Sequence, residues 1–121
     1  MNKIDQIEAL KQRTKEFSLR IIRLFQSLPK TDEARIVGKQ LLRSSTSVAA
    51  NYRAACRARS DAEFFSKISI VVEEADETLF WLELLVEATI IEKHLLTSLM
   101  DESEQLVKIM NTIRHNKKTK P

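Results

Sequence analysis

The sequence has few of the residues that turn a chain sharply. Among its 121 residues there are one glycine, Gly38, and two prolines, Pro29 and Pro121. The hairpins of a many-stranded sheet need glycine, or Asn-Gly and Asp-Gly pairs, at their turns. This shortage excludes such a sheet and predicts an all-helical chain.

Cysteine and long apolar runs are equally scarce. Cys56 is the only cysteine, so no disulfide can form within the chain, and we expect a small buried hydrophobic residue without chemistry. No apolar run approaches the roughly 20 residues that cross a bilayer, and the residues after Met1 lack the apolar core of a signal peptide. We therefore expect a cytoplasmic protein with no membrane partner.

The motifs of catalysis and metal binding are lacking too. Neither His94 nor His115 has an acid three residues before it, as the Glu-x-x-His sites of helical bundles require. Gly38 stands outside any glycine-rich phosphate loop, and no strained turn presents a nucleophilic serine. We expect no catalytic residue, metal, cofactor or small-molecule substrate, and hence no enzyme.

Charge, by contrast, is abundant and unevenly distributed. Residues 1–60 carry 13 Lys and Arg against 5 Asp and Glu, a net charge of +8. Residues 61–121 carry 7 against 12, a net charge of −5. Complementary halves of this kind can pair within one fold or between subunits.

Apolar residues recur at alternating spacings of three and four in four segments, which is the heptad pattern of packed helices. Thr31 and Ser60 are suitable N-caps, and Ser60 forms a capping box with Glu63. The pattern predicts helices over about 4–28, 32–57, 61–89 and 92–115. The short connections favour an all-α, up-down-up-down antiparallel four-helix bundle in one domain, residues 1–116, with a basic disordered tail, residues 117–121.

Polar residues interrupt the apolar pattern of the second helix. Ser44 and Asn51 stand where leucine is expected, and an unpaired buried polar group costs about 1–3 kcal/mol. We expect partners among Glu74 and Glu77 of the third helix and Glu102 of the fourth. A structural network that fixes register and oligomeric state is the favoured interpretation, and a ligand site is the alternative. The predicted buried polar network consists of Arg43, Ser44, Ser47, Asn51, Glu77 and Glu102.

The third helix has more apolar surface than its core face needs. Phe80, Trp81 and Leu84 extend that surface round to the far side of the helix. A helix that is apolar nearly all round is buried nearly all round. We therefore predict that these three residues form the interface of a homo-oligomer.

Basic residues gather at one pole of the predicted bundle. The start of the first helix, the connection between the second and third, and the end of the fourth all lie there. A large positive surface binds phosphate backbones without sequence preference, although lysines of a tail are also ordinary solubilising charge. The predicted nucleic-acid-binding residues are Arg53, Arg57, Arg59, Arg114, Lys117, Lys118 and Lys120.

An ordered set of short motifs covers the middle of the chain. It comprises Arg43-Ser44, Ser47-Val48, Asn51, Arg59-Ser60, Glu63-Phe64, Ala75, Glu77 and Trp81-Leu82. This combination resembles the bacterial four-helix bundle family of 23S rRNA-intervening sequence proteins. The chain departs from one common form of the family motif, Asn-Ile-x-Glu-Gly, at residues 51–55, where it has Asn-Tyr-Arg-Ala-Ala.

The resemblance implies a ring-like homo-oligomer, with a homopentamer favoured. It also implies RNA or a reverse transcriptase as a partner, because a relative with the same bundle is the accessory protein of diversity-generating retroelements. The sequence thus predicts a non-enzymatic, self-assembling bundle that binds RNA or a nucleic-acid-associated protein through its basic pole. The alternative is a protein–protein interaction scaffold without nucleic-acid contact.

Overall fold

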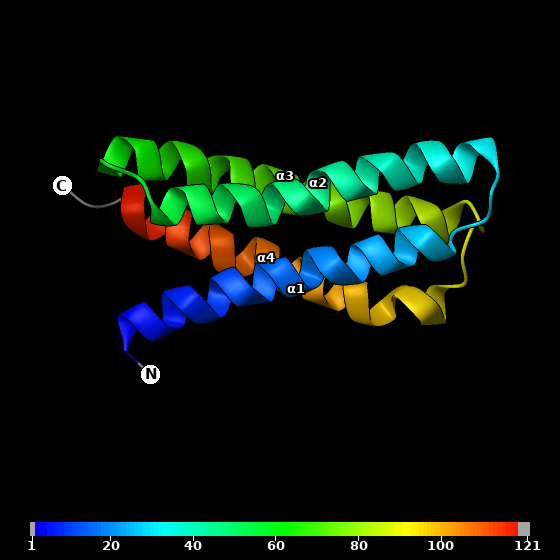
Figure 1. Ribbon diagram of the computed structural model, residues 1–121, viewed down its shortest axis with the longest axis horizontal. Coiled ribbons are helices and arrows are strands. Elements are labelled where there is room, and N and C mark those ends of the chain that lie inside the picture. The colour runs from blue at the N-terminus through cyan, green and yellow to red at the C-terminus, as the bar shows by residue number, and fades with distance from the viewer. Residues whose placement is uncertain (1, 119–121) are drawn as a thin grey trace.

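Four long helices make up the computed structural model, which describes residues 2–118, with the backbone alone at position 118. The helices are α1 (Lys3–Ser27), α2 (Asp32–Cys56), α3 (Asp61–Glu87) and α4 (Lys93–Lys118), and the described residues contain no strand. Consecutive helices run in opposite directions (Figure 1). The predicted all-α, up-down-up-down bundle is confirmed, and every predicted helix end lies within three residues of the observed one.

Side chains cap the first three helices at their N-termini. Asn2, Thr31 and Ser60 each accept a hydrogen bond from the backbone amide three residues further on, at 2.8, 3.3 and 3.0 Å. Each cap satisfies one of the amides that the first turn leaves without a partner. The short polar residues ahead of each apolar pattern therefore fix where these helices begin.

The end of α3 is a left-handed turn that holds a threonine. Thr89 has φ 59°, its amide donates to the Val86 carbonyl at 3.0 Å, and the Ile90 amide donates to the Leu85 carbonyl at 3.0 Å. This is a Schellman motif, in which glycine is the usual residue at the left-handed position. The motif ends α3 at Glu87, two residues before the predicted end.

The end of α4 also differs from the prediction. The helix continues to Lys118, so residues 117 and 118 belong to it and not to a disordered tail. Lys117 explains the extension, because its Nζ lies 2.8 Å from Asp61 Oδ1 and 5.2 Å from the centroid of the Phe64 ring. The remaining residues of the predicted tail, 119–121, lie outside the described part of the chain.

Close packing of α1 on α2 depends on the only glycine. A Cβ atom at Gly38 would lie 2.8 Å from Phe25 Cδ1 and 2.9 Å from Leu28 Cδ1. Nearby, the Ser18 hydroxyl donates to the Ser45 carbonyl across the same helix pair at 3.0 Å. Small residues therefore let these two helices approach closely near Gly38 and Ser45.

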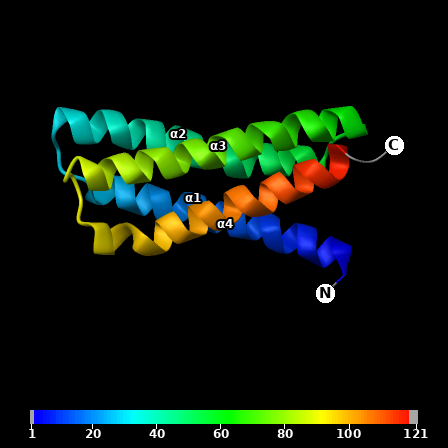
Figure 2. The ribbon, with the colours of Figure 1, turned by 180° about the vertical axis from the view of Figure 1, so that it is seen from behind.

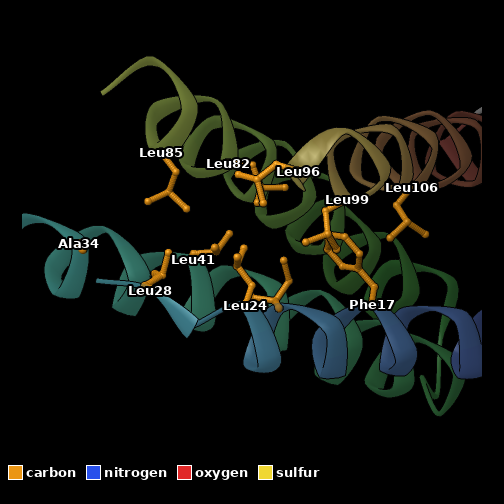
Figure 3. Close-up of a cluster of buried hydrophobic side chains, with 11 residues drawn as sticks. Phe17, Leu24, Leu28, Ala34, Leu41, Leu82, Leu85, Leu96, Leu99 and Leu106 are labelled. Carbon is orange, nitrogen blue, oxygen red and sulfur yellow. The ribbon is translucent and has the colours of Figure 1, made fainter. Parts of the chain in front are cut away.

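The core consists of two clusters that differ in the number of helices that contribute buried residues. The first contains buried residues from all four helices, including Phe17, Leu41, Leu82 and Leu106 (Figure 3). The second lies toward the other end of the bundle, and its buried members come only from α2, α3 and α4. At that end the N-terminal half of α1 departs from α4 (Figure 2). Three helices therefore form the buried core there.

Candidate nucleic-acid interface

The end where α1 departs is the predicted basic pole. The start of α1, the connection between α2 and α3, and the end of α4 lie together there (Figure 1). The predicted cations with described side chains at this pole are Arg53, Arg57, Arg59, Arg114 and Lys117. The side chain of Lys118 and the whole of Lys120 lie outside the described part of the chain.

Two of these cations are available to a ligand. Arg53 lies in the last turn of α2 and Arg57 is its C-cap, and both side chains are exposed. Among the side chains that the structure describes, neither has an ion-pair partner. A phosphate could therefore bind either guanidinium without displacing an acid.

The other three cations have contacts within the protomer. Arg59, although its side chain is 90% exposed, lies 3.7 Å from Glu63. Arg114 is half-buried and donates to Asn111 at 3.2 Å. Lys117 is held between Asp61 and Phe64 as described above. The predicted set thus divides into free arginines and cations with partners.

A groove that the sequence did not predict opens beside these cations. It has a volume of about 960 Å³ and lies between the departing half of α1, the end of α4 and the α2–α3 connection. Its apolar lining includes Ile7, Leu10, Tyr52, Phe64 and Ile113, and its charged lining includes Lys3, Arg13, Arg59, Asp61 and Lys117. An apolar surface bordered mainly by cations therefore occupies the basic pole.

A tight ion pair joins α1 to α4 beside the groove. Arg13 donates from Nε and Nη2 to the two carboxylate oxygens of Glu102 at 2.7 and 2.8 Å, and from Nη2 to Gln105 at 2.8 Å. The hydrogen bond to Glu102 raises the pKa of Arg13 above its ordinary value. Glu102 was predicted to join the network around Ser44. It binds α1 instead, because α4 lies beside α1 and α3 in the bundle and diagonally opposite α2.

The predicted polar residues of α2 also have separate partners. The buried Ser44 hydroxyl accepts from Thr78 of α3 at 2.9 Å and donates to the Leu41 carbonyl at 3.2 Å. Asn51 is half-buried and donates to the carbonyl and hydroxyl of Ser47, one turn earlier in its own helix. Of Ser44, Ser47 and Asn51, only Ser44 therefore joins α2 to another helix.

Arg43 and Glu77 form a cluster on the surface between α2 and α3. Arg43 pairs with Glu74 at 3.0 Å and with Glu77, and the Trp81 indole donates to Glu77 at 3.1 Å. The hydrogen bonds from Trp81 and from Arg43 lower the pKa of Glu77. Arg43 is exposed, so this cluster is not part of a buried network. The six residues predicted as one network therefore occupy four separate places.

The residues predicted to form an oligomer interface gather on the outer side of α3. Phe80 is 51% exposed and meets Trp81 edge to face, with ring centroids 5.0 Å apart. Trp81 and Leu84 are half-buried, and Trp81 packs against the first core cluster. Together they form a partly exposed apolar patch.

The remaining candidate groups are few. Cys56 is half-buried, and burial raises the pKa of its thiol, which keeps the thiol protonated at neutral pH. Among the described residues, no three His, Cys, Asp or Glu side chains are grouped so that they could hold a metal ion. No helical stretch in residues 2–118 combines the length and apolar character needed to cross a membrane.

A family model and a solved structure are similar to this chain. Residues 8–112 match the sequence model of a family described as 23S rRNA-intervening sequence protein. The fold is similar to a crystal structure from Bacteroides thetaiotaomicron VPI-5482, described as a protein with unknown function from the S23 ribosomal protein family. The two chains are 35% identical, with a TM-score of 0.83 over 90% of this chain and 97% of the other. No curated protein matches the sequence.

Proposed function

The chain belongs to the 23S rRNA-intervening sequence protein family, and from that premise we propose that it binds RNA through its basic pole as a non-enzymatic, self-assembling bundle in the cytoplasm. The observation that carries the proposal is the pair of exposed arginines without ion-pair partners among the described side chains, Arg53 and Arg57. They lie in the last turn and at the C-cap of α2, just before the chain enters α3, and Arg59 follows in the connection. Binding here would depend on charge and not on base sequence, because arginine pairs with phosphate oxygens of any nucleotide.

The exposed aromatic patch on α3 supports self-assembly. Phe80 gains from burial against a second chain, since aromatic residues bury about 150–250 Å² each and dominate the energetics of interfaces. The family resemblance favours a pentamer. A ring would repeat the basic pole and increase the positive field that attracts a phosphate backbone. A reverse transcriptase that holds the same RNA is the protein partner that the resemblance suggests.

Salt dependence of RNA binding tests the proposal. Removal of one cation that touches a phosphate lowers the slope of log affinity against log salt by about 0.7–0.9. Charge reversal at both arginines, Arg53→Glu with Arg57→Glu, should therefore lower the slope by about 1.4–1.8 and weaken binding to structured RNA. Circular dichroism should show an unchanged helix content, because exposed charge changes alter stability by less than about 0.5 kcal/mol.

A matched control places the same charge change at the opposite pole. Lys30→Glu with Lys39→Glu alters two exposed lysines beside and within the start of α2. This pair should leave most of the affinity intact. Equal losses from both pairs would show diffuse attraction with no defined pole.

A protein-interaction scaffold is the second candidate, and a specific observation favours it. Phe80 lies among acidic residues on the outer side of α3, which suits a protein surface and repels a phosphate backbone. Absence of RNA binding by the wild type at about 50 mM salt, where phosphate contacts are strong, would reject the RNA proposal and favour the scaffold.

A further inference from the structure

The outer side of α3 carries a regular ridge that the bundle does not use. Glu73, Asp76, Phe80, Glu83 and Glu87 follow one another at spacings of three and four, so they share one face of the helix. Four of the five are exposed and Glu83 is half-buried. Among the described side chains, none of the four acids forms an ion pair with a cation of its own protomer. This acidic ridge is centred on one exposed aromatic side chain.

The groove at the basic pole has the opposite character. Ile7 and Leu10 of α1 and Ile109 and Ile113 of α4 line it, and all four are only half-buried. Their spacing is that of residues that receive side chains from a facing helix. The two helices separate at this end (Figure 2), and the four apolar side chains keep part of their surface exposed. The groove can therefore accept the side chains of another helix.

The charges at the rim complement the ridge. Lys3, Arg59 and Lys117 line the groove, and Lys3 and Arg59 are exposed. Among the described residues that line the groove, the only acid is Asp61, which already pairs with Lys117. An aromatic knob with acids before and after it along a helix matches an apolar floor with cations at its edges.

The ridge and the groove of one protomer cannot meet. Phe64 lines the groove, and Phe80 lies 16 residues further along α3, about 24 Å away at about 1.5 Å per residue. α3 runs straight away from the basic pole (Figure 1). Any contact between the two surfaces must therefore join different molecules.

We propose that the groove of one protomer binds the acidic ridge of α3 of a second copy of this chain, with Phe80 inserted between α1 and α4. The inference rests on the self-assembly proposed above and names the surfaces that would carry it. Such a contact is head-to-tail, so each copy still offers one groove and one ridge. Repetition closes a ring or extends a filament, according to the rotation between neighbours.

This assembly and RNA binding use different cations. Arg53, Arg57 and Arg114 do not line the groove, whereas Lys3, Arg59 and Lys117 do. Phosphate would therefore reach the free arginines of each copy after the grooves are filled. Arg59, predicted from the sequence to bind nucleic acid, is assigned to the protein interface instead.

Two variants remove one surface each. Phe80→Lys removes the aromatic knob of the ridge, and Ile7→Glu with Arg59→Glu makes the groove acidic. Light scattering should give the mass of one chain for either variant at concentrations where the wild type is assembled. When the two are mixed, the intact groove of the first and the intact ridge of the second should join them into a 1:1 dimer that grows no further.

Two controls separate the interface from the fold. Ile36→Lys changes an apolar side chain that is 65% exposed and lies outside both surfaces, so it should leave the assembly unchanged. Arg59→Glu alone changes an exposed side chain outside the core, and should raise the dissociation constant about tenfold while the helix content stays constant. Loss of assembly without loss of helix shows that the interface, and not the fold, has failed.

The outcomes distinguish this inference from the proposal on which it rests. A wild type that scatters as one chain overturns both. A wild type that assembles while Phe80→Lys or the groove variant stays equally assembled overturns only the inference, and leaves self-assembly through another surface. Two monomeric variants that do not associate on mixing also overturn it, because a ridge-to-groove contact must be rescued by complementation.

Discussion

The ion pair between Arg13 and Glu102 should set how far α1 separates from α4. Hydrogen bonds to charged groups contribute about 1.5–3 kcal/mol when buried, and exposed ion pairs about 0–1 kcal/mol. This pair lies between those limits, since the side chains are 36% and 18% exposed. Its two-point geometry favours a value above that of an ordinary exposed ion pair. We therefore expect a coupling energy of about 1–2 kcal/mol.

A double-mutant cycle measures that coupling directly. Arg13→Ala, Glu102→Ala and the double variant are unfolded in urea, and the excess of the summed single effects over the double effect gives the energy of the pair. In a chain of this size the coupling corresponds to about 3–6 °C of melting temperature per kcal/mol. Hydrogen exchange shows which helix loses stability when the ion pair is removed. Amides in the first half of α1 should exchange faster in Glu102→Ala, and those of α2 should not.

An exposed pair on the same helix provides the control. Lys11 and Glu8 lie 3.1 Å apart, and the Glu8 side chain is 62% exposed. The same cycle there should give no more than about 0.5 kcal/mol. A coupling below about 0.3 kcal/mol for Arg13 and Glu102 would refute the reasoning and show that other contacts hold the edge of the groove.

Two further changes test the turn of α3 and the surface cluster. Thr89→Gly should raise the free energy of unfolding by about 1 kcal/mol, since glycine adopts the left-handed conformation without strain, whereas Thr89→Ala should not, because alanine keeps the Cβ atom. Urea unfolding decides, and equal effects of glycine and alanine would contradict this account. The lowered pKa of Glu77 means that its ionised form is favoured by folding, so its contribution is present above the ordinary value of 4.5 and is lost as the pH falls through the lower folded value. Melting temperature should therefore fall less steeply with acid in Glu77→Gln than in the wild type, and parallel curves would show that Glu77 contributes nothing.

The fold could be predicted because burial has the same period as the helix. Apolar residues such as Phe17, Ile21 and Leu24 recur as one face of α1, and all three are buried. The starts of α2 and α3 could be predicted because the caps at Thr31 and Ser60 bond to amides only three residues further along the chain. Helix ends were less predictable. The Schellman turn at Thr89 lacks the glycine that would indicate such a turn in the sequence. The last turn of α4 depends on Asp61, an acid far away in the sequence.

The candidate site was harder to predict than the fold, because a periodic pattern shows which face of a helix is apolar but not which neighbouring helix that face contacts. Glu102 follows the inward spacing of α4, but that spacing does not distinguish adjacent α1 from diagonal α2. Ile7 and Leu10 continue the pattern of α1 without interruption, although the helix axis leaves the bundle there. The basic pole itself followed from topology alone. Which of its cations already have partners depends on side-chain geometry that the sequence does not contain.

An even number of helices returns the chain to the pole from which it started. α1 begins and α4 ends at the same pole as the α2–α3 connection (Figure 1), so a tag fused to either end would be attached at the pole that holds Arg53 and Arg57. Affinities measured with a tagged protein would then describe a partly covered surface. Fluorophores belong at the other pole, in the turn between α1 and α2. A thiol introduced there by Lys30→Cys is exposed, while the raised pKa of Cys56 leaves the native thiol slow to react.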